Sequence, residues 1–137
     1  MLKRASAVVV VAAAYFMTVF ALAFAMGVVR TLIIAPRVGP TVAVCLEVPL
    51  LLVASWVIAG RLLSQRPLEL RERVAVGAIA FGLTMASEAL LSGLLRDQSV
   101  IEWAATLLSP LGLIGLAGQL GFAAMPALAG PNARVPA

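Results

Sequence analysis

Residues 5–29 read ASAVVVVAAAYFMTVFALAFAMGVV, a run without a single charged side chain. A helix needs about 20 mainly apolar residues to cross the hydrocarbon core of a bilayer, and this run is long enough. Three more stretches meet the same requirement, at residues 41–63, 74–95 and 100–128. Short connections favour antiparallel packing of sequential helices. The sequence therefore predicts an all-α integral membrane protein, an antiparallel up-and-down bundle of four transmembrane helices that forms one membrane domain over residues 1–137.

The overall composition agrees with a membrane location. Of the 137 residues, 63% are hydrophobic and 12% are charged, and the mean hydropathy is +1.09. This proportion of apolar side chains exceeds what a single soluble core can bury. The formal net charge of +4 does not indicate a nucleic-acid partner, because the arginines stand singly or in short groups between apolar runs. We expect the lipid bilayer as a partner, together with further copies of the chain or another membrane protein.

The titratable residues limit the chemistry that the chain can perform. The sequence has no histidine and one cysteine, Cys45. The usual ligands of zinc, haem and iron–sulfur clusters are therefore missing. The Ser-His-Asp and Cys-His arrangements of nucleophilic enzymes are missing as well. We expect no cofactor, no metal site and no enzymatic activity.

Positively charged residues fall mostly on one side of the predicted bundle. Lysine and arginine are enriched in the cytoplasmic loops of membrane proteins. One side has Lys3, Arg4, Arg61, Arg66, Arg71, Arg73 and Arg134, and the other side has Arg30, Arg37 and Arg96. This bias predicts a multi-pass protein of the cell membrane, a bacterial inner membrane, with both termini in the cytoplasm.

Two glutamates interrupt the apolar runs, Glu47 in TVAVCLEVPLLLVASW and Glu88 in AFGLTMASEALLSGLL. At 1.5 Å per residue, both lie roughly 9–10 Å below the same end of the bundle. An ionised carboxylate at the centre of a membrane helix costs on the order of 2.5–3.5 kcal/mol, so such residues normally face the interior and have partners. Arg30 and Arg37 are the expected partners because they lie at that end. Without them, the two carboxyl groups would share a proton.

Hydroxyl groups near Glu88 extend this candidate site. Ser92 follows Glu88 by four residues on the same helical face, and Ser87 is adjacent. Together with Glu47 and the two arginines, these residues are the candidates for an ion or substrate site. Small and hydroxylated residues at such spacing also occur where membrane helices simply pack, and packing is the alternative interpretation.

Pro49 stands two residues after Glu47 and cannot donate a backbone hydrogen bond. The carbonyl group of Cys45 therefore lacks its helical donor. Such an opening beside a carboxylate serves either as part of an ion site or simply as a bend in the helix.

The last apolar segment contains Gly112, Gly115, Gly118 and Gly121 at intervals of three, with Gln119 among them. Glycines at this density let another helix approach closely, within the bundle or between copies of the chain. Gln119 needs a buried partner, and an interhelical hydrogen bond is expected. The dipeptide at 109–110, Ser-Pro, predicts a kink in this helix.

Tyr15 lies near the centre of the first apolar segment. Tyrosine in membrane proteins usually lies at the interface, where its hydroxyl group meets water. At this depth, the hydroxyl group is expected to form a hydrogen bond inside the bundle, in a structural role.

Two functions fit these features. The first is a homo-oligomeric transporter or channel in which Glu47 and Glu88, balanced by Arg30 or Arg37, form a proton- or cation-responsive site. The second is a non-catalytic accessory or assembly subunit of a larger membrane complex, in which the same charges fix helix register. Water access to the glutamates favours transport. A closed Glu–Arg network beneath an exposed glycine flank favours the accessory role.

Overall fold

The computed structural model describes residues 1–130, and this part of the chain is almost entirely helical. The elements are α1 (Leu2–Val29), η1 (Arg30–Ile34), α2 (Ala35–Val38), α3 (Pro40–Gln65), α4 (Leu70–Arg96), α5 (Val100–Leu107) and α6 (Pro110–Leu128). Arg134, one of the cations that the sequence assigns to the cytoplasmic side, lies outside the described residues.

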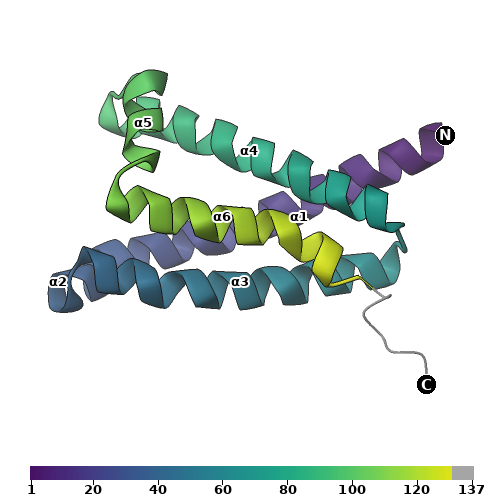
Figure 1. Ribbon diagram of the computed structural model, residues 1–137, viewed down its shortest axis with the longest axis horizontal. Coiled ribbons are helices and arrows are strands. Elements are labelled where there is room, and N and C mark those ends of the chain that lie inside the picture. The colour runs from purple at the N-terminus through teal and green to yellow at the C-terminus, as the bar shows by residue number, and fades with distance from the viewer. Residues whose placement is uncertain (131–137) are drawn as a thin grey trace.

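Four of the helical segments are long and apolar enough to cross a membrane. They are Leu2–Val38, Pro40–Gln65, Leu70–Arg96 and Pro110–Leu128. Figure 1 shows them lying side by side, with α2 and α5 at one end of the molecule and the N-terminus at the other. We call these the α5 end and the Arg4 end. The prediction of an all-helical chain with four apolar helices of membrane length is confirmed.

The sequence predicted that the first helix ends at Val29, but the helix continues beyond this residue. The chain continues through one π-helical turn, η1, and then through α2 to Val38. Nothing between Arg30 and Ile34 breaks a helix, and Pro36 is tolerated because it lies in the first turn of α2. The stop comes at Gly39, whose φ of 89° is a conformation that glycine adopts readily.

The last segment, predicted as one kinked helix over 100–128, is two helices. α5 ends at Leu107 and α6 begins at Pro110. Ser109 caps α6, since its Oγ accepts a hydrogen bond from the backbone N–H of Gly112 at 3.0 Å. Pro110 has no N–H to donate to the preceding turn, so the break is complete. Gly112 lets the end of α5 approach, because a Cβ atom there would overlap the carbonyl oxygen of Thr106.

The buried core lies toward the Arg4 end. It is built mainly from α1 side chains packed against α3 and α4, and its members include Val11, Ala12, Tyr15, Ala59, Leu63, Val76 and Ala80. Tyr15 is fully buried, and its ring stacks on that of Phe122 with centroids 4.6 Å apart. Its hydroxyl group donates to the carbonyl oxygen of Phe122 at 2.6 Å. The expectation that Tyr15 is bonded inside the bundle is therefore confirmed.

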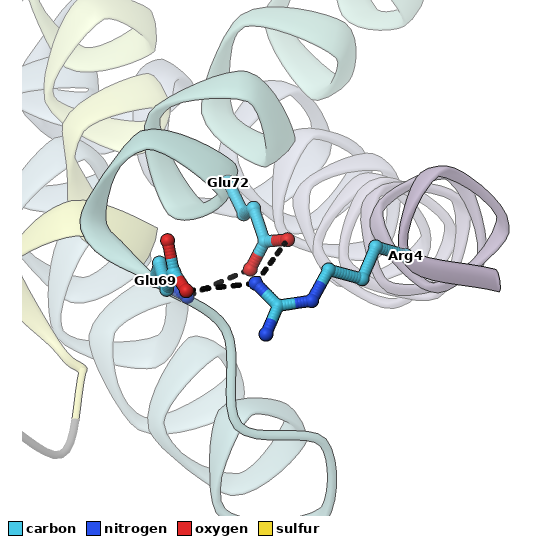
Figure 2. A network of polar contacts seen from close by, with 3 residues as sticks. All are labelled: Arg4, Glu69 and Glu72. Carbon is cyan, nitrogen blue, oxygen red and sulfur yellow. Dashed lines mark hydrogen bonds and ion pairs between the residues drawn. The ribbon is translucent and has the colours of Figure 1, made fainter. Parts of the chain in front are cut away.

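A charged network joins the first turns of α1 and α4, as Figure 2 shows. Arg4 Nη1 lies 2.7 Å from Glu69 Oε1 and 3.6 Å from Glu72 Oε1. Glu72 also accepts a hydrogen bond from the backbone N–H of Glu69 at 2.8 Å, which completes a capping box at the start of α4. The end of α6 lies nearby, because Arg73 Nη1 donates to the carbonyl oxygen of Ala127. The starts of α1 and α4 and the end of α6 thus share the Arg4 end.

Small residues set how closely α6 approaches its neighbours. A Cβ atom on Gly77 of α4 would overlap the backbone carbonyl of Ala123 in α6. On the other side of α6, a Cβ atom on Gly118 would lie 3.0 Å from Val48, and one on Gly121 would lie 2.7 Å from Leu52, both in α3. Gly118 and Gly121 therefore pack inside the chain, as the glycine spacing allowed.

Gly115 differs from its neighbours in the glycine series. A Cβ atom there would meet no heavy atom within 4 Å. The spacing of the series predicted a close helix contact at this position. Within the described residues, 1–130, Gly115 has no such contact. The reason is that Gly115 borders a cavity between the helices.

Candidate functional site

A cavity of about 730 Å³ lies between the helices in the half of the bundle nearer the α5 end. Residues from α1, η1, α3, α4, α5 and α6 line it. Most of the wall is apolar. The charged residues in the wall are Arg30, Glu47, Glu88 and Arg96.

Arg30 and Glu47 form an ion pair in this wall, with Arg30 Nε 2.9 Å from Glu47 Oε2. Arg30 is the first residue of η1, where the π-helical turn inserts an extra residue and changes the direction of the side chains that follow α1. Glu47 lies two turns into α3. The Glu47 side chain is 11% exposed and that of Arg30 is 33% exposed, so the pair is buried on the carboxylate side.

Glu88 has a different kind of partner. The side-chain amide of Gln119 in α6 donates from Nε2 to Glu88 Oε1 at 2.6 Å. Among residues 1–130, no lysine or arginine lies within ion-pair distance of Glu88. The two glutamates therefore border one cavity, one paired with a cation and the other with a neutral amide.

Other residues that the sequence proposed for this site fall into two groups. Ser92 lines the cavity, and its hydroxyl group donates to the side-chain oxygen of Gln98. Ser87 is absent from the cavity wall, because one step along a helix turns the side chain by about 100° away from that of Glu88. Arg37 is also absent from the wall. Its guanidinium folds back onto its own helix and donates to the carbonyl oxygen of Ile33 at 2.6 Å.

The predicted interhelical hydrogen bond of Gln119 is confirmed, but the sequence did not identify Glu88 as its partner. In one continuous helix from residue 100, Gln119 would lie about 29 Å from the α5 end, far below Glu88. Because the helix breaks before Pro110, depth is measured from the start of α6, and Gln119 lies only about 14 Å into this helix. The Ser-Pro dipeptide at 109–110 is the sequence signal that could have placed Gln119 at the depth of Glu88.

Two further residues with hydroxyl groups, Ser55 and Thr84, line the wall. Ser55 donates to the carbonyl oxygen of Leu51 at 2.7 Å, and Thr84 donates to that of Ala80 at 2.9 Å. Each proton is therefore used within its own helix. The hydroxyl oxygen of Thr84 remains as an acceptor at the wall, whereas Ser55 is fully buried.

α5 closes one side of the cavity with Trp103, Thr106 and Leu107. Its first turn is fixed by a capping box in which Glu102 accepts from the backbone N–H of Ser99 at 2.7 Å. This bond and that of the Ser99 hydroxyl group hold the pKa of Glu102 below its ordinary value.

The fold and the cavity define a class, a small all-helical protein with four helices of membrane length and a carboxylate-lined cavity between them. Within residues 1–130, no group of three or more His, Cys, Asp or Glu residues is placed to hold a metal ion. In comparisons with known proteins, no family model, no curated protein and no solved structure matches the chain.

Proposed function

We propose that this chain is a multi-pass protein of the bacterial inner membrane that acts as a homo-oligomeric transporter or channel, with Glu47 and Glu88 as a proton- or cation-responsive site. The observation that carries the proposal is the cavity itself. Two carboxylates, one from α3 and one from α4, border one space of about 730 Å³ instead of being sealed in a packed core. These two helices pack against α1 and α6, not against each other.

Membrane insertion as an antiparallel four-helix bundle is supported by the outer surface of the chain. Large apolar side chains are exposed on all four long helices, among them Val9, Met17, Phe24, Leu50, Val53, Trp56, Leu90 and Leu120. Soluble monomers rarely expose apolar surface so widely. The hydrocarbon core of a bilayer would cover these side chains, and the cationic Arg4 end would lie in the cytoplasm.

The different partners of the two carboxylates support a division of roles. The charge of Glu47 is balanced by Arg30 at 2.9 Å. Glu88 accepts a hydrogen bond from Gln119, but an amide cannot neutralise its charge. In our proposal, Glu88 therefore exchanges between a proton and a cation, and Glu47 with Arg30 holds the wall of the site.

Flux measurements in liposomes test this function. Purified protein is reconstituted, a pH gradient or a cation gradient is imposed, and flux is followed for the parent, Glu47→Gln and Glu88→Gln. We expect Glu88→Gln to alter flux while the bundle stays folded. Asp97→Asn is the matched control, because Asp97 is exposed, lies outside the cavity wall and has a left-handed φ of 55° that asparagine tolerates. Folded Glu variants with unchanged flux would end the transport proposal.

The accessory role remains the second candidate, and the Arg30–Glu47 pair is the observation in its favour, since an ion pair between η1 and α3 also fixes helix register. The glycine flank weighs against it, because Gly118 and Gly121 already pack against α3. Purification in mild detergent or nanodiscs separates the two. A homo-oligomer on its own supports transport, and a stoichiometric partner supports the accessory role. We propose no enzymatic activity for either case.

A further inference from the structure

We propose that the cavity binds a lipophilic ammonium ion, a small organic cation with N–H donors on an apolar body, whose ammonium group lies against Glu88. This inference deepens the proposed function and rests on it. It names the class of cation that the site takes.

The charges around the cavity single out Glu88 as the position of the ammonium group. η1 contributes Arg30 and α3 contributes Glu47, and these two neutralise each other at 2.9 Å. α4 contributes Glu88 and Arg96, which form no ion pair with each other. The cavity-lining residues of α1, α5 and α6 carry no charge. Glu88 is thus the carboxylate in the wall, as described over residues 1–130, that has no cation beside it.

The hydrogen-bonding groups point to a ligand that donates. Glu88 offers its remaining acceptor positions, and the hydroxyl oxygen of Thr84, one helical turn away on α4, can accept because its proton is already used within its helix. An ammonium group brings donors and a positive charge, so it can satisfy the remaining acceptor positions of Glu88 and neutralise this carboxylate at the same time. Charge-assisted hydrogen bonds of this kind are among the strongest in proteins.

The apolar walls decide against a bare metal ion. Divalent cations such as Ca²⁺ and Mg²⁺ are held largely by carboxylates, and no group of three or more His, Cys, Asp or Glu residues within residues 1–130 is placed to hold a metal ion. The wall instead contains four aromatic side chains, Phe20, Phe24, Trp103 and Phe122. They suit an apolar body, and their faces also attract organic cations. A volume of about 730 Å³ lies within the range of about 300–1,000 Å³ that is usual for small-molecule sites.

Gly115 offers a way to fill the cavity without disturbing the packing. On α6 it lies on the cavity-lining face, between Gly112 and Gly118, and a Cβ atom there would meet nothing within 4 Å. In the variant Gly115→Leu, the new side chain therefore occupies the space that the ligand would take. Gly118 cannot serve this purpose, because it packs on Val48.

Isothermal titration calorimetry of the detergent-solubilised protein at pH 7 tests the inference with two water-soluble probes, phenethylammonium and its neutral analogue 2-phenylethanol. We expect saturable binding of the ammonium, with an affinity about tenfold or more above that of the alcohol, because only the ammonium pairs with Glu88. Glu88→Gln should remove this preference and leave the affinity for the alcohol unchanged. Gly115→Leu should weaken both probes, and Asp97→Asn neither.

Equal affinities of the two probes for the parent protein would overturn the inference, and that comparison needs no variant. Ammonium binding that survives in folded Glu88→Gln would overturn it as well. The outcome is distinct from that of the flux experiment. Binding without flux would leave the site standing and end the transport proposal, whereas inorganic-cation flux without ammonium binding would leave transport standing and end this inference.

Discussion

At the scale of single residues, Tyr15 supplies a donor that the backbone of α6 lacks. The carbonyl of Phe122 would normally accept from the N–H four residues later, but that residue is Pro126. The hydroxyl group of Tyr15 takes this place at 2.6 Å, from a helix far away in the sequence. A carbonyl group without a helical donor has no water to bond to in a membrane interior. The side chain of Tyr15 therefore completes the hydrogen bonding of α6.

Tyr15→Phe should lower stability by about 1–3 kcal/mol, the usual cost of leaving a buried polar group without a partner. Thermal unfolding in detergent measures the effect. Thr18→Val on the same helix is the control, since the Thr18 hydroxyl group donates to the carbonyl of Ala14, which belongs to its own helix. If both variants melted together with the parent, the Phe122 carbonyl would have another donor.

The Arg30–Glu47 pair gives a second prediction at this scale. Removing one partner of a fully buried pair costs about 3–5 kcal/mol, and removing both is often nearly neutral. Because Arg30 is one-third exposed, solvent screening reduces this cost. We expect Arg30→Gln alone to lower the free energy of unfolding by about 1–2 kcal/mol. Arg30→Gln with Glu47→Gln should recover part of the loss. A double-mutant cycle of melting temperatures measures the coupling, and strictly additive losses would show that the pair contributes nothing.

The sequence was a good guide to depth and a poor guide to partners. Counting residues from the helix ends placed Glu47 near Arg30, because each residue lies only a short way from the α5 end of its helix. The same counting could not find Gln119 for Glu88, since it assumed one helix where there are two. Nor did it choose between Arg30 and Arg37. That choice depends on the π-helical turn, which residue counts do not reveal.

At the scale of helices, the contact of α4 with α6 depends on Gly77. A Cβ atom there would overlap a backbone carbonyl, which cannot rotate away as a side chain can. Gly77→Ala should therefore destabilise the protein by about 1–3 kcal/mol by forcing the helices apart. Gly82 on the same helix has no neighbour within 4 Å, so Gly82→Ala should instead stabilise by about 0.5–1 kcal/mol. Chemical or thermal unfolding measures the stability of the two variants. Equal changes in stability for Gly77→Ala and Gly82→Ala would contradict the close contact of α4 with α6.

The junction of α1 and α4 should weaken in acid. The hydrogen bond and the charge of Arg4 hold the pKa of Glu69 below its ordinary value. A lowered folded pKa contributes stability that is fully present above the unfolded pKa, about 4.3, and is lost as the pH falls through the folded value. Arg4→Gln should thus lower the melting temperature slightly at pH 7, and its difference from the parent should shrink as the pH falls below about 4.3.

The matched control for this junction is Arg66→Gln, because Arg66 is exposed and takes no part in the ion pairs of residues 1–130. Its melting temperature should follow that of the parent at every pH. A difference between Arg4→Gln and the parent that grew in acid would have the wrong sign for this network.

Element boundaries were predictable only where a strong breaker or a long apolar run defined them. α3 and α4 agree with their predicted ranges within a few residues at each end. The first helix was predicted to end at a charge, but a charge alone does not stop a helix, whereas Gly39 does. At residues 109–110 the capping serine and the proline act together, so a complete break replaced the predicted kink.

At the scale of the whole molecule, the proposed topology puts the Arg4 end in the cytoplasm. In a Cys45→Ala background, Arg66→Cys should react only with thiol reagents that reach the cytoplasm, and Arg37→Cys only with reagents applied outside. The physical reason is the excess of lysine and arginine at the Arg4 end. Labelling of intact cells and inverted vesicles with a membrane-impermeant maleimide measures both. Reaction of position 66 from outside would reverse the proposed orientation.

The contacts of α1 also set the order in which the chain is assembled during synthesis. Arg4 and Glu69 are separated by 65 residues, and Tyr15 and Phe122 by 107. At about 5–20 residues per second, the ribosome needs on the order of 5–20 seconds between making Tyr15 and making its acceptor. The first helix therefore gains its contacts in steps, first with α3 and α4 and last with α6. A nascent chain that stalls before Phe122 therefore lacks the acceptor that the Tyr15 hydroxyl group has in the folded protein.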